Sequence, residues 1–136
     1  MSKESEQVVS KALIVVDVQK DFLPGGALAV LGGDEIVPDI IELIGKDEYE
    51  MVAYTIDWHP ADHGSFYTNA GVDPFSTFDL NGIDQVAWPP HCIQGTDGAK
   101  LHPDVNQARY TKREAYIYKG MDPNVDSYSG FYDRSE

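Results

Sequence analysis

Three side chains in this sequence have the types and spacing of a divalent-metal site. Asp57 and His59 lie two residues apart, so in an extended chain both side chains point to the same side. His91 follows Pro89-Pro90, which stiffen the backbone and leave the imidazole little conformational entropy to lose. One carboxylate and two imidazoles suit Zn²⁺, Fe²⁺ or Mn²⁺ with open coordination positions. The same spacing also allows a turn aspartate and two surface histidines.

The other histidines and the cysteine have alternative interpretations. His63 follows His59 by four residues and could be a further ligand, a substrate contact or a packing residue, of which the last two are preferred. His102, in a Leu-His-Pro sequence, is interpreted as a turn residue. Cys92 could be a nucleophile beside His91, but a metal-bound His91 could not act as its base. A small buried side chain is therefore the preferred interpretation of Cys92.

An ionisable residue follows each of three short apolar segments. The pairs are residues 12–16 with Asp17, residues 51–56 with Asp57, and residues 115–118 with Lys119. Their apolar and β-branched composition predicts strands, the first two buried on both faces. Ligands of open parallel α/β sheets bind beyond the carboxyl ends of the strands. We therefore expect the three charged side chains to share one site.

A helix is predicted between the first two strands, over residues 35–43. Four isoleucines recur close to helical spacing there, and Asp34 is a candidate N-cap. Strand, helix and strand in this order predict parallel pairing with a right-handed crossover. Residues 58–110 are rich in Pro, Gly, His and aromatics with little periodicity, so we expect an ordered binding loop.

Composition narrows the class of protein. A chain of 136 residues is enough for one α/β domain, and no linker or repeat divides it. With 10 basic and 23 acidic residues the net charge is -13, which disfavours nucleic acid and anionic membranes as partners. One cysteine cannot form an internal disulfide, and the polar N-terminus is unlike a signal peptide. These features together predict a soluble, cytoplasmic protein.

Several segments, in order, cover nearly the whole chain and resemble one family. They are residues 13–22 (LIVVDVQKDF), 24–30 (PGGALAV), 57–60 (DWHP), 63–66 (HGSF), 88–92 (WPPHC), 95–96 (GT), 101–103 (LHP), 118–120 (YKG) and 126–131 (DSYSGF). The set resembles the nicotinamidase/pyrazinamidase branch of the isochorismatase-like cysteine hydrolases. The resemblance implies an α/β, parallel-sheet, three-layer Rossmann-like fold with a long metal-binding loop.

The resemblance also implies an activity and its residues. Members hydrolyse nicotinamide, or pyrazinamide, to nicotinate and ammonia through a cysteine thioester, a step of NAD salvage in pyridine nucleotide biosynthesis. The implied catalytic residues are Asp17 and Lys119. The implied ligands of one divalent metal (Zn, Fe or Mn) are Asp57, His59 and His91, with His63 an extra ligand in some members. The implied pocket residues are Phe22 and Trp88, which flank the pyridine ring, and Leu28 and Tyr128, which line the wall.

The family's nucleophilic cysteine is the part of the pattern that this sequence departs from. The family places it well downstream of the lysine strand, and the sequence ends at Glu136 before such a segment. We therefore expect a single domain truncated at its C-terminus, inactive alone, whose exposed sheet edge a complementary chain or a second copy would cover. The alternative is a noncatalytic metal- and pyridine-binding module or a subunit of a split enzyme. A non-haem iron oxygenase is disfavoured, because helix and strand alternate and an Asp/Lys pair is present.

Overall fold

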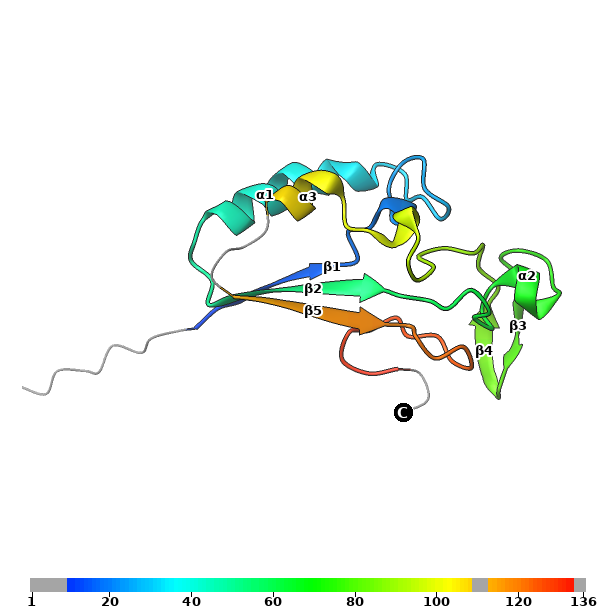
Figure 1. Ribbon diagram of the computed structural model, residues 1–136. Coiled ribbons are helices and arrows are strands. Elements are labelled where there is room, and N and C mark those ends of the chain that lie inside the picture. The colour runs from blue at the N-terminus through cyan, green and yellow to red at the C-terminus, as the bar shows by residue number, and fades with distance from the viewer. Residues whose placement is uncertain (1–9, 109–112, 134–136) are drawn as a thin grey trace, which may run out of the picture.

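Three parallel strands form the centre of the computed structural model, which describes residues 10–108 and 113–133 (Figure 1). β1 (Ala12–Val16), β2 (Met51–Asp57) and β5 (Glu114–Lys119) lie in the order β1-β2-β5. The register pairs Val16 with Thr55 and Asp57 with Lys119. The carboxyl ends of all three strands therefore lie at one edge of the sheet, as the apolar segments predict. β5 begins one residue earlier than predicted and includes Lys119.

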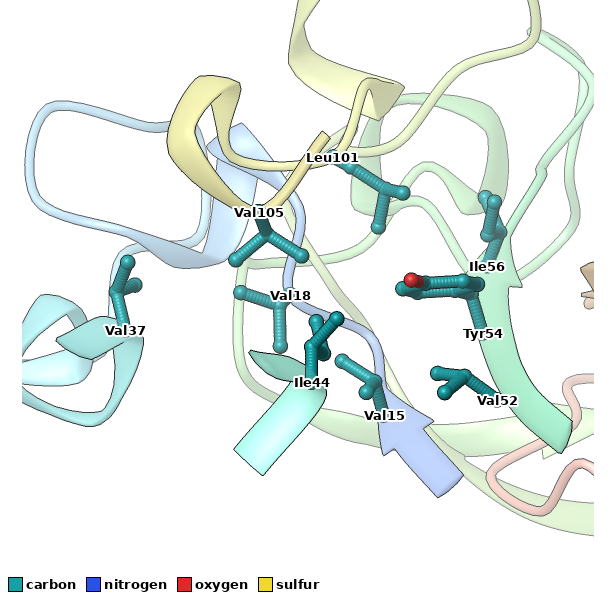
Figure 2. Packing of buried hydrophobic residues seen from close by; sticks show 9 residues of the cluster. All are labelled: Val15, Val18, Val37, Ile44, Val52, Tyr54, Ile56, Leu101 and Val105. Atoms are coloured by element: carbon teal, nitrogen blue, oxygen red, sulfur yellow. The ribbon is translucent and has the colours of Figure 1, made fainter. Parts of the chain in front are cut away.

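Two helices cover one face of this sheet. α1 (Val37–Gly45) and α3 (Pro103–Gln107) pack against each other and lie on the same side of the strands (Figure 1). Buried side chains from both helices, the sheet and the adjoining loops form the core in Figure 2: Val15, Val18, Val37, Ile44, Val52, Tyr54, Ile56, Leu101 and Val105. Because side chains alternate along a strand, Asp57 projects to the face opposite these helices.

The opposite face is only partly covered, so one prediction for β1 was wrong. β2, the central strand, is buried along almost its whole length. In β1, however, Ile14 and Val16 are 47% and 59% exposed. β1 lies at the edge of the described sheet, and the chain after β5 passes beneath Thr55 and Ile117 rather than β1. Burial on both faces therefore holds for β2 but not for β1.

The helix after β1 begins later than the sequence predicts. Residues Gly33–Ile36 form a 3-10 turn, η2, and the α-helix starts at Val37. No side chain caps α1, so the predicted N-cap role of Asp34 was wrong. Pro38 lies in the first turn of α1, where its missing N–H and restricted φ suit a helix start.

The stretch predicted as one long loop contains regular elements. It holds α2 (Tyr67–Ala70), β3 (Thr77–Leu80), β4 (Ile83–Val86), the 3-10 helix η3 (Asp97–Ala99) and α3. β3 and β4 form an antiparallel hairpin around Asn81-Gly82, whose φ angles are 52° and 90°. Asn-Gly is the strongest short hairpin signal because both residues tolerate positive φ. A third 3-10 helix, η1 (Lys20–Phe22), follows β1.

None of the described helices is long and apolar enough to cross a membrane. Residues 1–9, which are part of the polar N-terminus interpreted as unlike a signal peptide, lie outside the described residues. The end of the predicted loop, at residues 109–110, lies outside them as well.

Ile44→Ala should destabilise the fold much more than Ile36→Ala. Ile44 is 4% exposed in the core of Figure 2, whereas Ile36 is 50% exposed. Truncating a buried isoleucine leaves a cavity and typically costs about 2–5 kcal/mol, while an exposed one costs about 0.5 kcal/mol. Urea unfolding followed by circular dichroism measures both. Equal losses would mean that α1 does not pack against the sheet as described.

Candidate active site

Lys119 lies between two carboxylates at the carboxyl edge of the sheet. Its Nζ is 2.9 Å from Asp17 Oδ2 and 2.7 Å from Asp57 Oδ1, and the residue is 8% exposed. The structure therefore brings together the three ionisable residues that end the apolar segments. One buried cation between two carboxylates leaves a net negative charge that would attract a second cation.

Asp17 is oriented by Thr55, a residue that the sequence analysis missed. The Thr55 hydroxyl donates to Asp17 Oδ1 at 2.6 Å, which leaves Oδ2 facing Lys119. The Asp17 N–H is 3.1 Å from both the carbonyl oxygen and Oγ1 of Thr55. The φ of Asp17 is 52°, a left-handed conformation that ends β1 and that aspartate tolerates better than most residues.

We call Asp57, His59 and His91 the cation cage. The two histidines lie beside the Asp57 oxygen that faces away from Lys119. Asp57 Oδ2 is 3.2 Å from His59 Nε2 and 3.6 Å from His91 Nε2. All three residues are buried, and their ligand atoms lie within 4.8 Å of one another. His59 Nε2 is the one buried side-chain nitrogen or oxygen of the described residues without a hydrogen-bond partner. An orphaned atom aimed into such a cluster suits a metal ligand.

The second ring nitrogen of each cage histidine faces a backbone carbonyl. His59 Nδ1 is 2.7 Å from Gly120 O, and His91 Nδ1 is 2.8 Å from Pro89 O. A carbonyl oxygen only accepts, so in the neutral histidines Nδ1 carries the hydrogen and Nε2 keeps its lone pair. Metal-binding histidines are held in this way. The residues of the cage therefore fit a divalent cation.

Two residues that the sequence analysis did not single out hold this arrangement in place. Gly120 has a φ of 68°, and a Cβ there would lie 2.5 Å from His59 Cε1, so the close approach requires glycine. Gln19 is fully buried, and its Oε1 accepts the Asp57 N–H while its Nε2 donates to Asp57 O, each at 2.8 Å. Both backbone polar groups of Asp57 are thus held by one side chain.

The electrostatics keep Asp57 and Lys119 ionised. Burial alone would raise the pKa of Asp57, but its contacts with His59 and His91 and the charge of Lys119 outweigh burial and lower that pKa far below its usual range. Burial alone would lower the pKa of Lys119, but the charges of Asp57 and Asp17 raise it. The pair therefore stays charged through the physiological pH range.

His63 lies beside the cage but has partners on both ring nitrogens. Its Nδ1 accepts the Ser65 N–H at 3.1 Å, and its Nε2 faces Val125 O at 3.3 Å. Burial, followed by the charge of His59, lowers the pKa of His63. His63 also forms a cluster with His59 and Asp126. Because its nitrogens are already engaged, the geometry favours packing over metal ligation for His63.

Of the residues expected to contact substrate, Phe22 lies against a cage histidine. The Phe22 ring centroid is 5.5 Å from that of His91, next to an apolar depression of about 430 Å³ beside Asp17. Trp88 Nε1 donates to Tyr128 Oη at 3.3 Å, so these two side chains are in contact. Leu28 lies in the loop after Phe22, where its N–H donates to the Asp21 carbonyl oxygen.

Cys92 and His102 occupy structural positions. Cys92 has no exposed surface, and burial, followed by the charges of Asp57 and Asp21, raises the pKa of its thiol far above the usual range. A protonated, inaccessible thiol is a poor nucleophile. His102 Nδ1 accepts the Asp104 N–H at 3.1 Å and caps α3.

The fold and site define an α/β protein with an Asp–Lys pair and a candidate divalent-metal site at the carboxyl edge of a parallel sheet. No family model matches the chain. The chain is 46% identical over 125 residues to a nicotinamidase of Escherichia coli (strain K12), covering 90% of this chain and 57% of that protein. It is 39% identical over 124 residues to a nicotinamidase/pyrazinamidase of Mycobacterium tuberculosis.

Solved structures agree with these relatives. A nicotinamidase/pyrazinamidase of Acinetobacter baumanii superposes with a TM-score of 0.81 at 47% identity, covering 90% of this chain and 57% of that one. Yeast nicotinamidase bound to the inhibitor nicotinaldehyde gives 0.80 at 32% identity, covering 91% and 63%. Pyrococcus horikoshii pyrazinamidase in complex with zinc gives 0.68 at 36% identity, covering 88% and 57%.

The chain is therefore homologous to the nicotinamidases and pyrazinamidases over nearly all of its length, and it has their isochorismatase-like fold. It spans a little over half of the length of the curated relatives it matches, 57% in the E. coli protein. The predicted resemblance to the nicotinamidases and the predicted α/β fold are confirmed.

Cys92 should resist alkylation in the folded protein. Its thiol is inaccessible and its pKa is raised, so little thiolate is available. Iodoacetamide at pH 8 should label it only after denaturation, as intact mass spectrometry would show. Rapid labelling of the native protein would mean that Cys92 is exposed and reactive.

Proposed function

We propose that this chain carries the acid/base pair and the metal-binding part of a nicotinamidase. The observation that carries this proposal is the Asp57 carboxylate, which contacts Lys119 through one oxygen and both cage histidines through the other. The nicotinamidases among its homologues support nicotinamide as the substrate, and the yeast structure with nicotinaldehyde supports a pyridine ligand. Pyrazinamide, a similar flat amide, would fit the same chemistry.

The proposed reaction has two steps. A thiolate attacks the amide carbonyl carbon, the C–S bond forms, the C–N bond breaks, and the nitrogen leaves as ammonia with an added proton. Water then cleaves the thioester, which yields nicotinate and restores the thiol. Asp17 would take the thiol proton and deliver it to the leaving nitrogen. Lys119, held by both carboxylates, would stabilise the thiolate.

Asp57, His59 and His91 would hold one divalent ion, for which the zinc-bound Pyrococcus relative is support. Zinc, iron and manganese all suit these ligands. The ion would supply a Lewis-acidic anchor for the ring nitrogen and so orient the carboxamide. Phe22 and Trp88 would flank the ring, and Leu28 and Tyr128 would line the wall of the pocket. His63 would pack against His59.

The reactive thiol is proposed to come from a polypeptide segment outside this sequence. Cys92, the one cysteine of the sequence, is buried and unsuited to attack. On this proposal residues 1–136 belong to one domain. A complementary chain would supply the thiol, whereas a second copy would only cover the exposed sheet edge. The partly exposed β1, with Ile14 and Val16, is where such a partner would find apolar surface. The reaction would take place in the cytoplasm as part of NAD salvage.

His91→Ala should weaken Zn²⁺ binding by at least about 100-fold, because it removes one of three ligands. Competition with a chromophoric chelator measures the affinity. His102→Ala is the matched control, since His102 caps α3 and does not contact the cage. Equal affinities for the two variants would place the metal elsewhere.

Lys119→Ala should abolish ammonia release from nicotinamide in a completed enzyme. The assay mixes the chain with the part of the E. coli relative that it does not match. Loss of Lys119 leaves two carboxylates facing each other and removes the cation that stabilises the thiolate. Lys100→Ala, which affects an exposed lysine, should keep its activity.

Turnover that survives in Lys119→Ala would contradict the assigned role. Stoichiometric metal and nicotinamide binding without turnover in any mixture would favour the noncatalytic binding module, which the unsuitability of Cys92 also motivates.

A further inference from the structure

The backbone of Cys92 connects two cage residues, His91 and His59. Its carbonyl oxygen accepts the His59 N–H at 2.9 Å, and the residue follows His91 directly. Its φ is 46°, a left-handed conformation that a cysteine rarely adopts. A non-glycine residue stays in such a conformation only where its surroundings hold it there.

The Asp21 carboxylate holds the Cys92 backbone in this conformation. Its Oδ2 accepts the Cys92 N–H at 2.8 Å, across 71 residues of sequence, and its Oδ1 accepts the Ala27 N–H at 3.2 Å. A hydrogen bond to an ionised carboxylate is stronger than one between neutral groups. Asp21 lies in η1, the short 3-10 helix that follows β1 in the chain, so the contact connects the segment that carries His91 to the segment that leaves the central sheet.

Gly98 shapes the space around this carboxylate. A Cβ at position 98 would overlap the Asp21 side chain, and all three of its nearest atoms belong to that carboxylate. Gly98 lies in η3 and does not have a positive φ, so its backbone would accept alanine without strain. The nearby Asp21 carboxylate, rather than the backbone conformation, therefore explains why residue 98 is a glycine.

We propose that Asp21 is a positioning residue for metal binding: by holding the Cys92 N–H it sets where His91 Nε2 points relative to His59 and Asp57. The inference rests on the proposed metal site and adds a residue that does not itself touch the metal. Supporting groups of this kind typically change metal affinity by 10- to 100-fold when removed.

The test measures Zn²⁺ affinity by chelator competition, together with the Co²⁺ absorption spectrum, which reports ligand geometry. Asp21→Ala should weaken Zn²⁺ binding by about 10- to 100-fold and change the Co²⁺ bands. Asp21→Asn, which keeps an acceptor for Cys92, should restore most of the affinity. Asp97→Ala removes the same charge from an exposed neighbouring side chain, 71% exposed, and should bind like the parent.

Gly98→Ala tests the position of the Asp21 carboxylate without removing the Asp21 side chain. Alone, it should displace the Asp21 carboxylate and weaken binding. In the Asp21→Ala background it should have no further effect, because the atoms it would overlap are gone, and such non-additivity measures coupling. If Asp21→Ala does not fold, as urea unfolding in EDTA would reveal, Asp21→Asn and Gly98→Ala decide the question.

Three results would overturn the inference while leaving the metal site intact. These are parent-like affinity in Asp21→Ala, equal weakening in Asp21→Asn and Asp21→Ala, and a full additional effect of Gly98→Ala on Asp21→Ala. A parent chain that binds no Zn²⁺ or Co²⁺ would overturn both this inference and the proposed metal site.

Discussion

The two oxygens of the Asp57 carboxylate face different groups. Oδ1 lies 2.7 Å from Lys119 Nζ, and Oδ2 faces the Nε2 atoms of His59 and His91. Burying a carboxylate is unfavourable unless its charge is compensated on every side. Here Lys119 faces one oxygen, and His59 and His91 face the other. The acid/base pair and the metal-binding residues are therefore parts of one electrostatic unit, and neither half would be stable in this form without Asp57.

The fold supplies the rigidity that this unit needs. β2 is the central strand and is buried along nearly its whole length, so Asp57 emerges from the most constrained part of the sheet. Pairing with β5 places Lys119 directly beside it. Around this centre, Thr55, Gln19 and the Gly120 carbonyl each fix one group of the site by a hydrogen bond. Well-supported side chains of this kind are what precise binding and catalysis require.

Local patterns in the sequence were sufficient for the three parallel strands and for the clustering of their charged ends. Short β-branched runs have few alternatives, and parallel strands bring their carboxyl ends to one edge. Local patterns did not predict burial where it depends on tertiary contacts. Ile14 and Val16 have the composition of a doubly buried strand, yet they are exposed because β1 lies at the edge of the described sheet. The Asn81-Gly82 hairpin was predictable and was overlooked, because alternation in β3 and β4 is short.

The identity of the chemical groups, an Asp–Lys pair and an Asp-x-His with a later His, was determined by the sequence itself, as was the relationship to the nicotinamidases. Only the tertiary structure decided which atoms of those groups are available. No local pattern separates His63 from His59. Both ring nitrogens of His63 have partners, in Ser65 and Val125. In His59 the Gly120 carbonyl contacts only Nδ1, so Nε2 has no hydrogen-bond partner. The roles of Gln19, Asp21 and Thr55 come from contacts spanning 38 to 71 residues, and no local pattern encodes a hydrogen bond of that range.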